Sequence, residues 1–311
     1  MPELSEADRI QREVFLKTMV PRARHAFWAT SRIAEAMEDV VTRAGDVVYE
    51  SGTPAEHYYF VVEGQVEMVR PGGAPWTVTG PGLVGVIDVA LARPHVRQAV
   101  AKTDARILRL PAAVWFDALE DSFDLARAVI SSMAGVVLGL RMRPPPAGGF
   151  DPPVATAKGA VIHSVVDRIL FLRDVPIFRS ASTQALTTLA ETTEVVTLAP
   201  GASLFAADAV SSRLYVLVSG EVEVVHAMGP VTGRFRAGSL VGGPAALVEQ
   251  HGGFAARATE PSTVLSIDFD DYFDVMEEHF SLGRSAMTFM ATEVDLLLER
   301  DAANPAGSNV R

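Results

Sequence analysis

One long internal repeat constrains the fold of this chain more than any other feature of its sequence. The segment GDVVYESGTPAEHYYFVVEGQVEMV (45–69) aligns without a gap on GASLFAADAVSSRLYVLVSGEVEVV (201–225), at a shift of 156 residues. Further along, WFDALEDSFDLAR (115–127) aligns on YFDVMEEHFSLGR (272–284) at a shift of 157. Chance does not hold one offset over about 125 residues. We therefore predict two copies of one structural unit.

A segment rich in proline and glycine separates the two copies. MRPPPAGGFDPPVATAKGA (142–160) contains five proline and three glycine residues, a composition that favours an extended spacer over a packed helix. The length of 311 residues also suits two domains of about 150 residues each. We predict a first domain over 1–142, a linker over 143–160, a second domain over 161–300 and a disordered tail over 301–311.

The apolar periodicity changes twice within each copy. Segments 5–19 and 162–173 have helical spacing, and 181–192 indicates a second short helix. The middle of each copy breaks into short runs of Val, Tyr and Phe between Gly, Pro, Asp and Ser, which is typical of an antiparallel roll or barrel. From Pro111 and from Asp270 the helical pattern returns. The expected fold class is α+β, mainly β: two tandem double-stranded β-helix (jelly-roll-like) rolls, each flanked by α-helices.

Two glycines occupy the same place in both copies. Gly64 and Gly220 fall between two strand-like runs. A tight hairpin turn at this place requires a positive φ, which glycine adopts without steric cost. We expect both glycines to have that conformation.

Composition excludes several classes of function. The chain has 27 Lys and Arg against 38 Asp and Glu, a net charge of −11, which opposes binding to nucleic-acid phosphates. It has no cysteine, and its histidines lack metal-binding spacing, so we expect no metal site and no enzymatic activity. The longest apolar stretch, 128–140, is shorter than the roughly 20 residues of a membrane span. Because the N-terminal segment also lacks a secretory signal, we expect a cytoplasmic protein without membrane contact.

The charge is distributed unevenly between the two copies. Residues 1–150 contain 16 basic and 18 acidic side chains, a net charge of −2. Residues 151–311 contain 11 basic and 20 acidic side chains, a net charge of −9. An anionic ligand would therefore meet less repulsion in the first copy.

The repeated motif resembles a known family. The run RAGDVVYESGTPAEHYYFVVEGQVEMV (43–69) resembles the opening strands of the cyclic-nucleotide-binding domain, which bacterial catabolite-activator-type regulators share with the regulatory subunits of cAMP-dependent kinase. FLRDVPIF (171–178) is similar to the family's lead-in helix, and AKTDARILRL (101–110) to its last strands. The matching positions are Gly45, Asp46, Gly52, Tyr59, Val62, Gly64 and Val66, and in the second copy Gly201, Asp208, Tyr215, Val218, Gly220 and Val222.

The resemblance implies a ligand site in the first copy. In the family, a short helix supplies N–H groups and a carboxylate that accepts from the ribose hydroxyl, and an arginine nine residues later pairs with the cyclic phosphate. The corresponding stretch is GVIDVALARPHVRQAV (85–100). One alignment makes Asp88 the carboxylate and Arg97 the arginine. The nucleotide-binding candidates, with cAMP or cGMP as the ligand and no other cofactor, are then Gly85, Asp88, Ala90, Arg97 and Gln98.

A second alignment of the same stretch removes the site. It places Val86 at the carboxylate position and His95 at the arginine position. In the second copy, VGGPAALVEQHGGFAAR (241–257) has only Gly or Pro at both positions, and Arg257 comes several residues too late. We expect this second copy not to bind a cyclic nucleotide in the family's way.

The apolar helices that follow each roll indicate a partner surface. Segments 123–140 and 280–298 have too many apolar residues to be left uncovered. Their own rolls, the other repeat, a protein partner or a second copy of the chain could cover them. We expect a non-enzymatic regulatory or adaptor protein with divergent or lost nucleotide binding, acting through protein–protein contacts.

Two alternative functions stay open at this point. The first is a cyclic-nucleotide sensor that uses the first domain only. The second is a DNA-binding transcriptional regulator. It is disfavoured because the eleven residues after Arg300, DAANPAGSNVR, leave no room for a helix-turn-helix.

Overall fold

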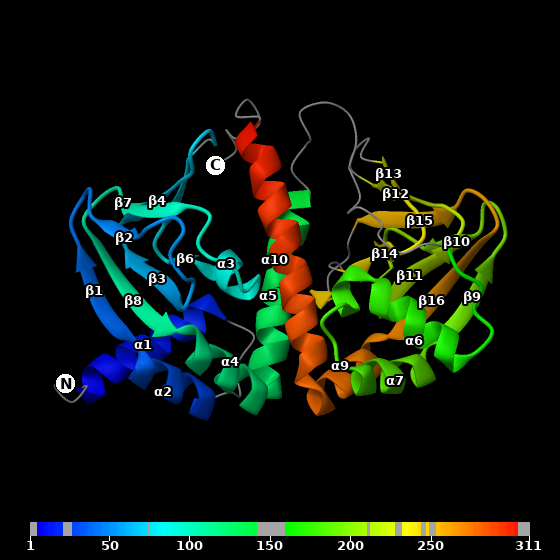
Figure 1. Cartoon of the computed structure of the whole chain (residues 1–311), viewed down its shortest axis with the longest axis horizontal. Coiled ribbons are helices and arrows are strands. Elements are labelled where there is room, and N and C mark those ends of the chain that lie inside the picture. The colour runs from blue at the N-terminus through cyan, green and yellow to red at the C-terminus, as the bar shows by residue number, and fades with distance from the viewer. Residues whose placement is uncertain are drawn as a thin grey trace. The chain divides into compact units, whose positions relative to one another are not determined.

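The computed structural model describes residues 5–20, 27–73, 75–141, 159–209, 212–227, 232–243, 247–248 and 253–303. These residues divide into two compact units (Figure 1). The first contains the described residues up to Val129 together with those from Val294 onward, and the second is Ile130–Glu293. The predicted linker up to residue 158 and the predicted tail from residue 304 lie outside the described residues.

The first unit contains a roll of two four-stranded antiparallel sheets. Their strand orders are β1-β8-β3-β6 and β2-β7-β4-β5. Tyr59, Val61 and Ile107 from one sheet and Val66 and Ala99 from the other belong to one buried cluster, which is the core of the roll. The strands are β1 (Glu38–Thr42), β2 (Val47–Tyr49), β3 (His57–Glu63), β4 (Gln65–Val69), β5 (Trp76–Thr79), β6 (Gly82–Val84), β7 (Gln98–Ala101) and β8 (Ala105–Pro111).

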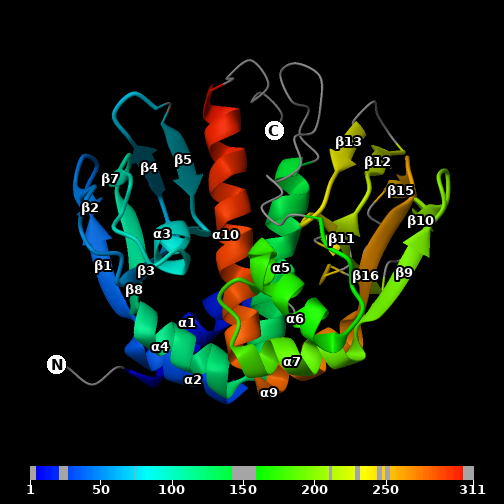
Figure 2. The same cartoon turned by 45° about the vertical axis from the view of Figure 1, so that its right-hand side comes forward.

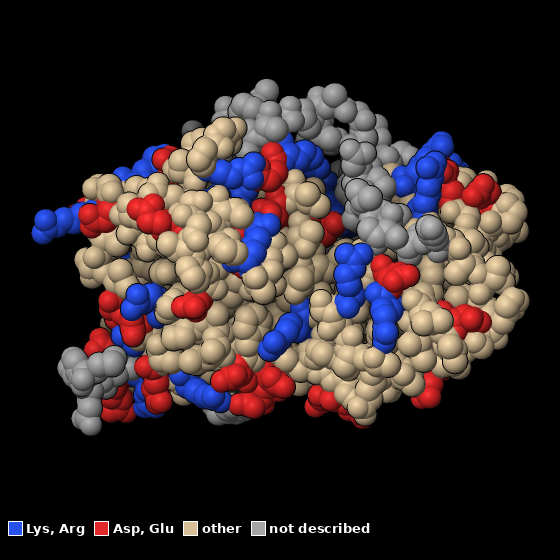
Figure 3. All heavy atoms as spheres, viewed as in Figure 1, with Lys and Arg blue, Asp and Glu red and all other residues tan. Residues whose placement is uncertain are grey.

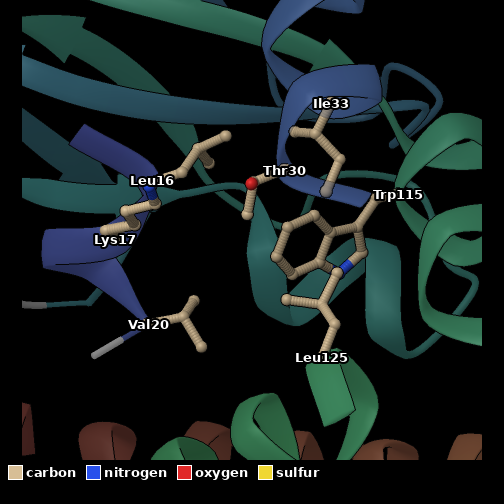
Figure 4. Close-up of a pocket in the computed structure, with 7 residues that line it drawn as sticks. All are labelled: Leu16, Lys17, Val20, Thr30, Ile33, Trp115 and Leu125. Atoms are coloured by element: carbon tan, nitrogen blue, oxygen red, sulfur yellow. The ribbon is translucent and has the colours of Figure 1, made fainter. Parts of the chain in front are cut away.

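Helices flank this roll and cover its end. They are α1 (Glu6–Met19), α2 (Phe27–Ala36), α3 (Val86–Ala90), α4 (Ala112–Asp121), the start of α5 (Phe123–Arg141) and the end of α10 (Phe280–Ala303). Figure 4 shows a small pocket among α1, α2, α4 and α5, into which the Trp115 ring projects. Its lining is mainly apolar: Leu16, Lys17, Val20, Thr30, Ile33, Trp115 and Leu125.

The second unit repeats the architecture of the first strand by strand. Its sheets have the orders β14-β11-β16-β9 and β10-β15-β12-β13, the same orders with eight added to each strand number. The predicted fold class of two tandem rolls is therefore confirmed. The strands are β9 (Glu194–Leu198), β10 (Ser203–Phe205), β11 (Arg213–Ser219), β12 (Val222–His226), β13 (Thr232–Phe235), β14 (Leu240–Val241), β15 (Phe254–Ala258) and β16 (Ser262–Asp268).

The predicted helices of the second copy are also present. The capping box at Ser164 and Asp167 begins α6, because each side chain accepts from a backbone N–H that the helix leaves unpaired. The helices of this unit are α6 (Val165–Asp174), the 3₁₀ turn η1 (Pro176–Phe178), α7 (Thr183–Thr192), α9 (Phe269–Glu278), the end of α5 and the start of α10.

An arginine that hydrogen-bonds to helix-end carbonyls is repeated at the helix pair that precedes each roll. Arg12 Nη1 donates to the carbonyls of Ala34 and Met37, at 3.1 and 2.6 Å. Its equivalent at the 156-residue shift, Arg168, donates to the carbonyls 156 residues further on, Ala190 and Thr193, at 2.9 and 2.7 Å. Each arginine thus satisfies carbonyls at the end of the following helix, which the helix itself cannot pair.

The two hairpin glycines have the expected conformation. Gly64 has φ +89° and Gly220 has φ +87°. A Cβ on Gly64 would lie 2.7 Å from Ala105 Cβ, and one on Gly220 would lie 2.6 Å from the Pro261 carbonyl oxygen. Glycine is needed at both places for two reasons, because the backbone has a positive φ and a neighbouring strand lies too close for a side chain.

Helix α5 is long and apolar enough to cross a membrane by length and composition, alone among the described residues. Its apolar window spans nearly the whole helix, but half of the window is buried within the protein. A core helix of a globular protein has the same properties.

Candidate functional site

The candidate site lies around the short helix α3 of the first unit. Gly85 is the N-cap of this helix and has φ +83°. It is enclosed, since a Cβ at this position would lie 3.2 Å from the His57 carbonyl oxygen and 3.3 Å from the Tyr59 ring. Helix α10 (orange to red) runs past α3 in both views (Figures 1 and 2), and ion pairs join its last turns to Arg93 and Arg97 in the loop that follows α3.

Asp88, the candidate carboxylate, is buried and its oxygens already have partners. Oδ1 accepts from Arg93 Nε at 2.7 Å, and Oδ2 accepts from the Val96 N–H at 3.3 Å. Burial acts to raise the pKa of Asp88, but the hydrogen bonds from His95 and Arg93 outweigh it, so the pKa lies below its usual value. Asp88 is therefore held as a carboxylate that orders the loop after α3.

His95 and Tyr49 form a stacked pair beside Asp88. The ring centroids lie 3.8 Å apart with an angle of 17° between the planes, and His95 Nδ1 lies 3.5 Å from Asp88 Oδ2. Burial raises the pKa of the Tyr49 hydroxyl, and the Asp88 charge raises it further while the Arg97 charge opposes this. The charges of Asp88 and Arg97 therefore shift the pKa of Tyr49 in opposite directions. Each of these two side chains hydrogen-bonds with other residues.

Arg97, the candidate phosphate ligand, is bound to carboxylates of the protein itself. Only 4% of its side chain is exposed. Nη1 lies 3.2 Å from Asp295 Oδ1, and Nη2 is paired with Glu299. The guanidinium also lies over the Trp76 ring, 4.1 Å from its centroid, which is a favourable cation–π geometry. Burial lowers the pKa of Arg97, and the Asp295 charge opposes that shift.

Two further arginines, which the sequence analysis did not single out, flank the same carboxylates. Arg93 Nη2 donates to Asp295 Oδ2 at 2.6 Å, and Arg70 Nη2 lies 2.9 Å from Glu299 Oε2. The result is an alternating chain of charges, which we call the arginine–carboxylate ladder. Its members, in order, are Asp88, Arg93, Asp295, Arg97, Glu299 and Arg70.

The ladder joins three arginines and three carboxylates, so its formal charge is zero. Two of its acids, Asp295 and Glu299, come from the acidic C-terminal half of the sequence, in the part of α10 that belongs to the first unit. Acidic and basic side chains are likewise intermixed over the protein face in Figure 3. The spacing of Asp295 and Glu299, four residues apart on one helix, was the one signal in the sequence that both side chains share a helix face.

The remaining predicted candidates have structural surroundings of their own. Ala90 is the last residue of α3 and is half-buried. Gln98 is the first residue of β7, and its Nε2 donates to Glu50 at 2.5 Å. No ligand contact tests the choice between the two alignments, so the assignment of all five candidates stays a prediction.

The equivalent site of the second unit is described only in part. Gly242 corresponds to Gly85 at the 157-residue shift and also has a positive φ, +82°. Residues 244–246 and 249–252 of the corresponding stretch 241–257 lie outside the described residues. Arg257 lies on β15 with its side chain largely exposed, and its Nη2 donates to Glu223 at 3.2 Å.

Comparison with known proteins identifies the family. The model of the cyclic nucleotide-binding domain matches residues 40–122 and 195–279, one segment in each unit and together more than half of the chain. The chain belongs to the cyclic nucleotide-binding domain family. The two matched segments coincide with the two rolls, so this is a tandem cyclic nucleotide-binding domain protein, as the sequence indicated.

Several solved structures are similar to this chain at low sequence identity. The regulatory domain of Toxoplasma gondii PKA with cAMP has 14% identity and a TM-score of 0.36, over 88% of this chain and 94% of that one. The regulatory subunit of a cAMP-independent protein kinase A from Trypanosoma brucei has 16% identity and a TM-score of 0.36, over 97% of this chain and 92% of that one. The family assignment rests on the two matched segments.

Proposed function

We propose that this tandem cyclic nucleotide-binding domain protein is a non-enzymatic regulator or adaptor whose first domain does not use a cyclic nucleotide. The observation that supports this most directly is the pairing of Arg97. A cyclic phosphate would need this guanidinium, but the side chain is buried against Asp295 and Glu299. Displacing two carboxylates from a buried arginine opposes the binding of a singly charged phosphate.

The surroundings of Asp88 support the same proposal. A carboxylate that selects ribose must have an oxygen available to accept from a hydroxyl group. Both oxygens of Asp88 instead lie against groups of the loop that follows α3, with Arg93 on one and Val96 and His95 on the other. This carboxylate therefore contributes to the local structure, and the alternative of a sensor in the first domain requires that loop to rearrange.

Calorimetry tests the proposal directly. Full-length protein titrated with cAMP and with cGMP should give no binding heat at micromolar concentrations. The Arg97→Ala variant serves as the comparison, because in a cyclic-nucleotide sensor this substitution removes a heat that the wild-type protein gives. A wild-type affinity in the micromolar range that Arg97→Ala abolishes overturns the proposal and establishes the sensor.

The proposed mode of action is contact with a protein through the helices that follow the rolls. Each of these helices has an exposed apolar side chain: Val136 on α5 is 53% exposed and Leu296 on α10 is 59% exposed. A homodimer or a complex formed through these helices should be independent of nucleotide. Light scattering should then give a mass above that of one chain, and Val136→Glu or Leu296→Glu should reduce it.

A wild-type protein that is monomeric by light scattering and recovers no partner in a pull-down counts against contact through α5 and α10. The Val41→Glu variant is a matched control, because Val41 lies on the outer face of β1 and is 82% exposed. It introduces the same charge on an exposed valine that belongs to neither helix. Its measured mass should equal that of the wild-type protein.

A further inference from the structure

The ladder has a geometry that suits two anionic groups rather than one. Asp295 and Glu299 are four residues apart on α10, which places their side chains on one helix face with Cβ atoms about 5–6 Å apart. Arg97 lies between them and pairs with both. The outer side of Asp295 is bound by Arg93 and that of Glu299 by Arg70. The protein thus surrounds two separate negative charges with three guanidinium groups.

The three arginines come from separate places in the first unit and converge only in the folded state. Arg70 follows β4, Arg93 lies in the loop after α3, and Arg97 immediately precedes β7. Trp76, on β5, lies against the Arg97 guanidinium. These groups belong to the body of the first unit, whereas the two carboxylates belong to the C-terminal part of α10, which ends at Ala303.

The side chains of the ladder are buried to different extents, and this bears on whether a ligand can replace the two carboxylates. The Arg97 side chain is 4% exposed, but Glu299 and Arg70 at the end of the ladder are 31% and 42% exposed. Pairs that exposed to water contribute little to stability, about 0–1 kcal/mol each. The Glu299–Arg70 end of the ladder is therefore the place where the helix end would separate first, and its departure would uncover Arg97.

We propose that Arg70, Arg93 and Arg97 form a binding site for a ligand that has two separate anionic groups, and that Asp295 and Glu299 are its built-in occupants. This inference rests on the proposed function, since it assumes that a cyclic monophosphate is not the ligand of this site. A cyclic monophosphate has one anionic group and matches one of the two carboxylates. A bisphosphate with its two groups on opposite sides of a small ring system matches both, and it competes with the end of α10.

The test compares two nucleotides that share a base and a sugar. Adenosine 3′,5′-bisphosphate has two anionic groups and cAMP has one. The protein is the full chain with Asp295→Asn and Glu299→Gln, which removes both charges and keeps the side-chain volumes. We expect this variant to bind the bisphosphate at least about tenfold more tightly than it binds cAMP and than the wild-type protein binds the bisphosphate. Either Arg70→Gln or Arg93→Gln, added to the variant, should remove that preference.

A matched control separates the site from general charge. The Glu277→Gln, Asp301→Asn variant also loses two negative charges, one on α9 and one on α10, but keeps the ladder intact. It should bind the bisphosphate no better than the wild-type protein. If this control gains affinity as the ladder variant does, or if the ladder variant binds both nucleotides equally or neither, the two-anion site is wrong.

Hydrogen exchange of the wild-type protein gives an answer even if the ladder variant does not fold. The bisphosphate at high concentration should accelerate amide exchange in residues 294–303, and cAMP at the same concentration should not. Unchanged exchange with both nucleotides overturns the two-anion site. That outcome leaves the proposed function intact, whereas tight binding of cAMP by the wild-type protein overturns the proposed function.

Discussion

Arg97 and Asp295 are 198 positions apart in the sequence, and Arg97 Nη1 lies 3.2 Å from Asp295 Oδ1. This contact joins the residue that the family resemblance marks as the phosphate ligand to a carboxylate on the last helix. The chain itself therefore supplies an anion, the Asp295 carboxylate, that pairs with Arg97. The contribution of this ion pair to the stability of the first unit can be measured without a ligand.

Removing the Arg97 charge should destabilise the first unit strongly. Arg97→Gln removes the buried central charge of the ladder, while Asp295 keeps its pair with Arg93 and Glu299 its pair with Arg70. The expected cost is about 1.5–3 kcal/mol, the usual range for hydrogen bonds to a charged group. Urea unfolding followed by tryptophan fluorescence measures the loss. Arg109→Gln is the matched control, because its pair with Glu38 is 40% and 43% exposed and should be worth less than about 1 kcal/mol. Equal losses in the two variants would contradict the structural role of the ladder.

The stability of the first unit should depend on the ionisation of Asp88. Because the folded pKa of Asp88 lies below its usual value of 3.8, its charged form stabilises the folded state above that pH. The stabilisation is lost as the pH falls through the lower, folded pKa. The difference in unfolding free energy between the wild-type protein and Asp88→Asn should therefore be largest near neutral pH and decrease below about pH 4. A difference that stays constant from pH 7 to pH 3 contradicts this assignment.

The hairpin glycines should resist substitution in both domains. Gly64→Ala and Gly220→Ala each combine a positive φ with a clash against the neighbouring strand, and each should cost more than about 2 kcal/mol. Gly72→Ala is the control for the cost of a positive φ without a clash. Gly72 has φ +74°, and a Cβ added there would have no atom within 4 Å. This substitution should cost about 1 kcal/mol. Thermal unfolding distinguishes the two sizes of effect, and a Gly64→Ala cost no larger than that of Gly72→Ala argues against the close approach.

The repeated helix-capping arginine should matter in the second unit as it does in the first. Arg168→Met removes the donor to the Ala190 and Thr193 carbonyls and should cost about 2 kcal/mol, the usual loss for hydrogen bonds to a charged group. Arg173→Met, on the same helix, removes an exposed bond to Thr183 Oγ1 and should cost under about 1 kcal/mol. Chemical denaturation of both variants compares the losses, and an Arg168→Met loss as small as that of Arg173→Met would show that these carbonyls do not need the cap.

Local patterns in the sequence were sufficient for the architecture. The repeat predicted two equivalent units, and both sheets recur with the same strand order. The β-bulges recur as well, at Val47–Tyr49 and Ser203–Phe205, exactly one repeat apart. These features follow from short-range rules, since turn glycines, strand alternation and helix caps depend on residues close together in the chain.

Only the tertiary structure decided what the arginine of the first domain binds. The sequence determined that Arg97 exists, that it follows a short helix, and that the acidic half of the chain lies elsewhere. It could not bring Asp295 and Glu299 to Arg97, because that contact depends on where the last turns of α10 pack in the folded first unit. Ion pairs between residues this distant leave no local pattern. The physical reason is that apolar residues recur at the period of a helix or a strand, whereas the partners of an ion pair do not recur at any fixed spacing. Which carboxylate pairs with Arg97 therefore depends on how the helices and strands pack.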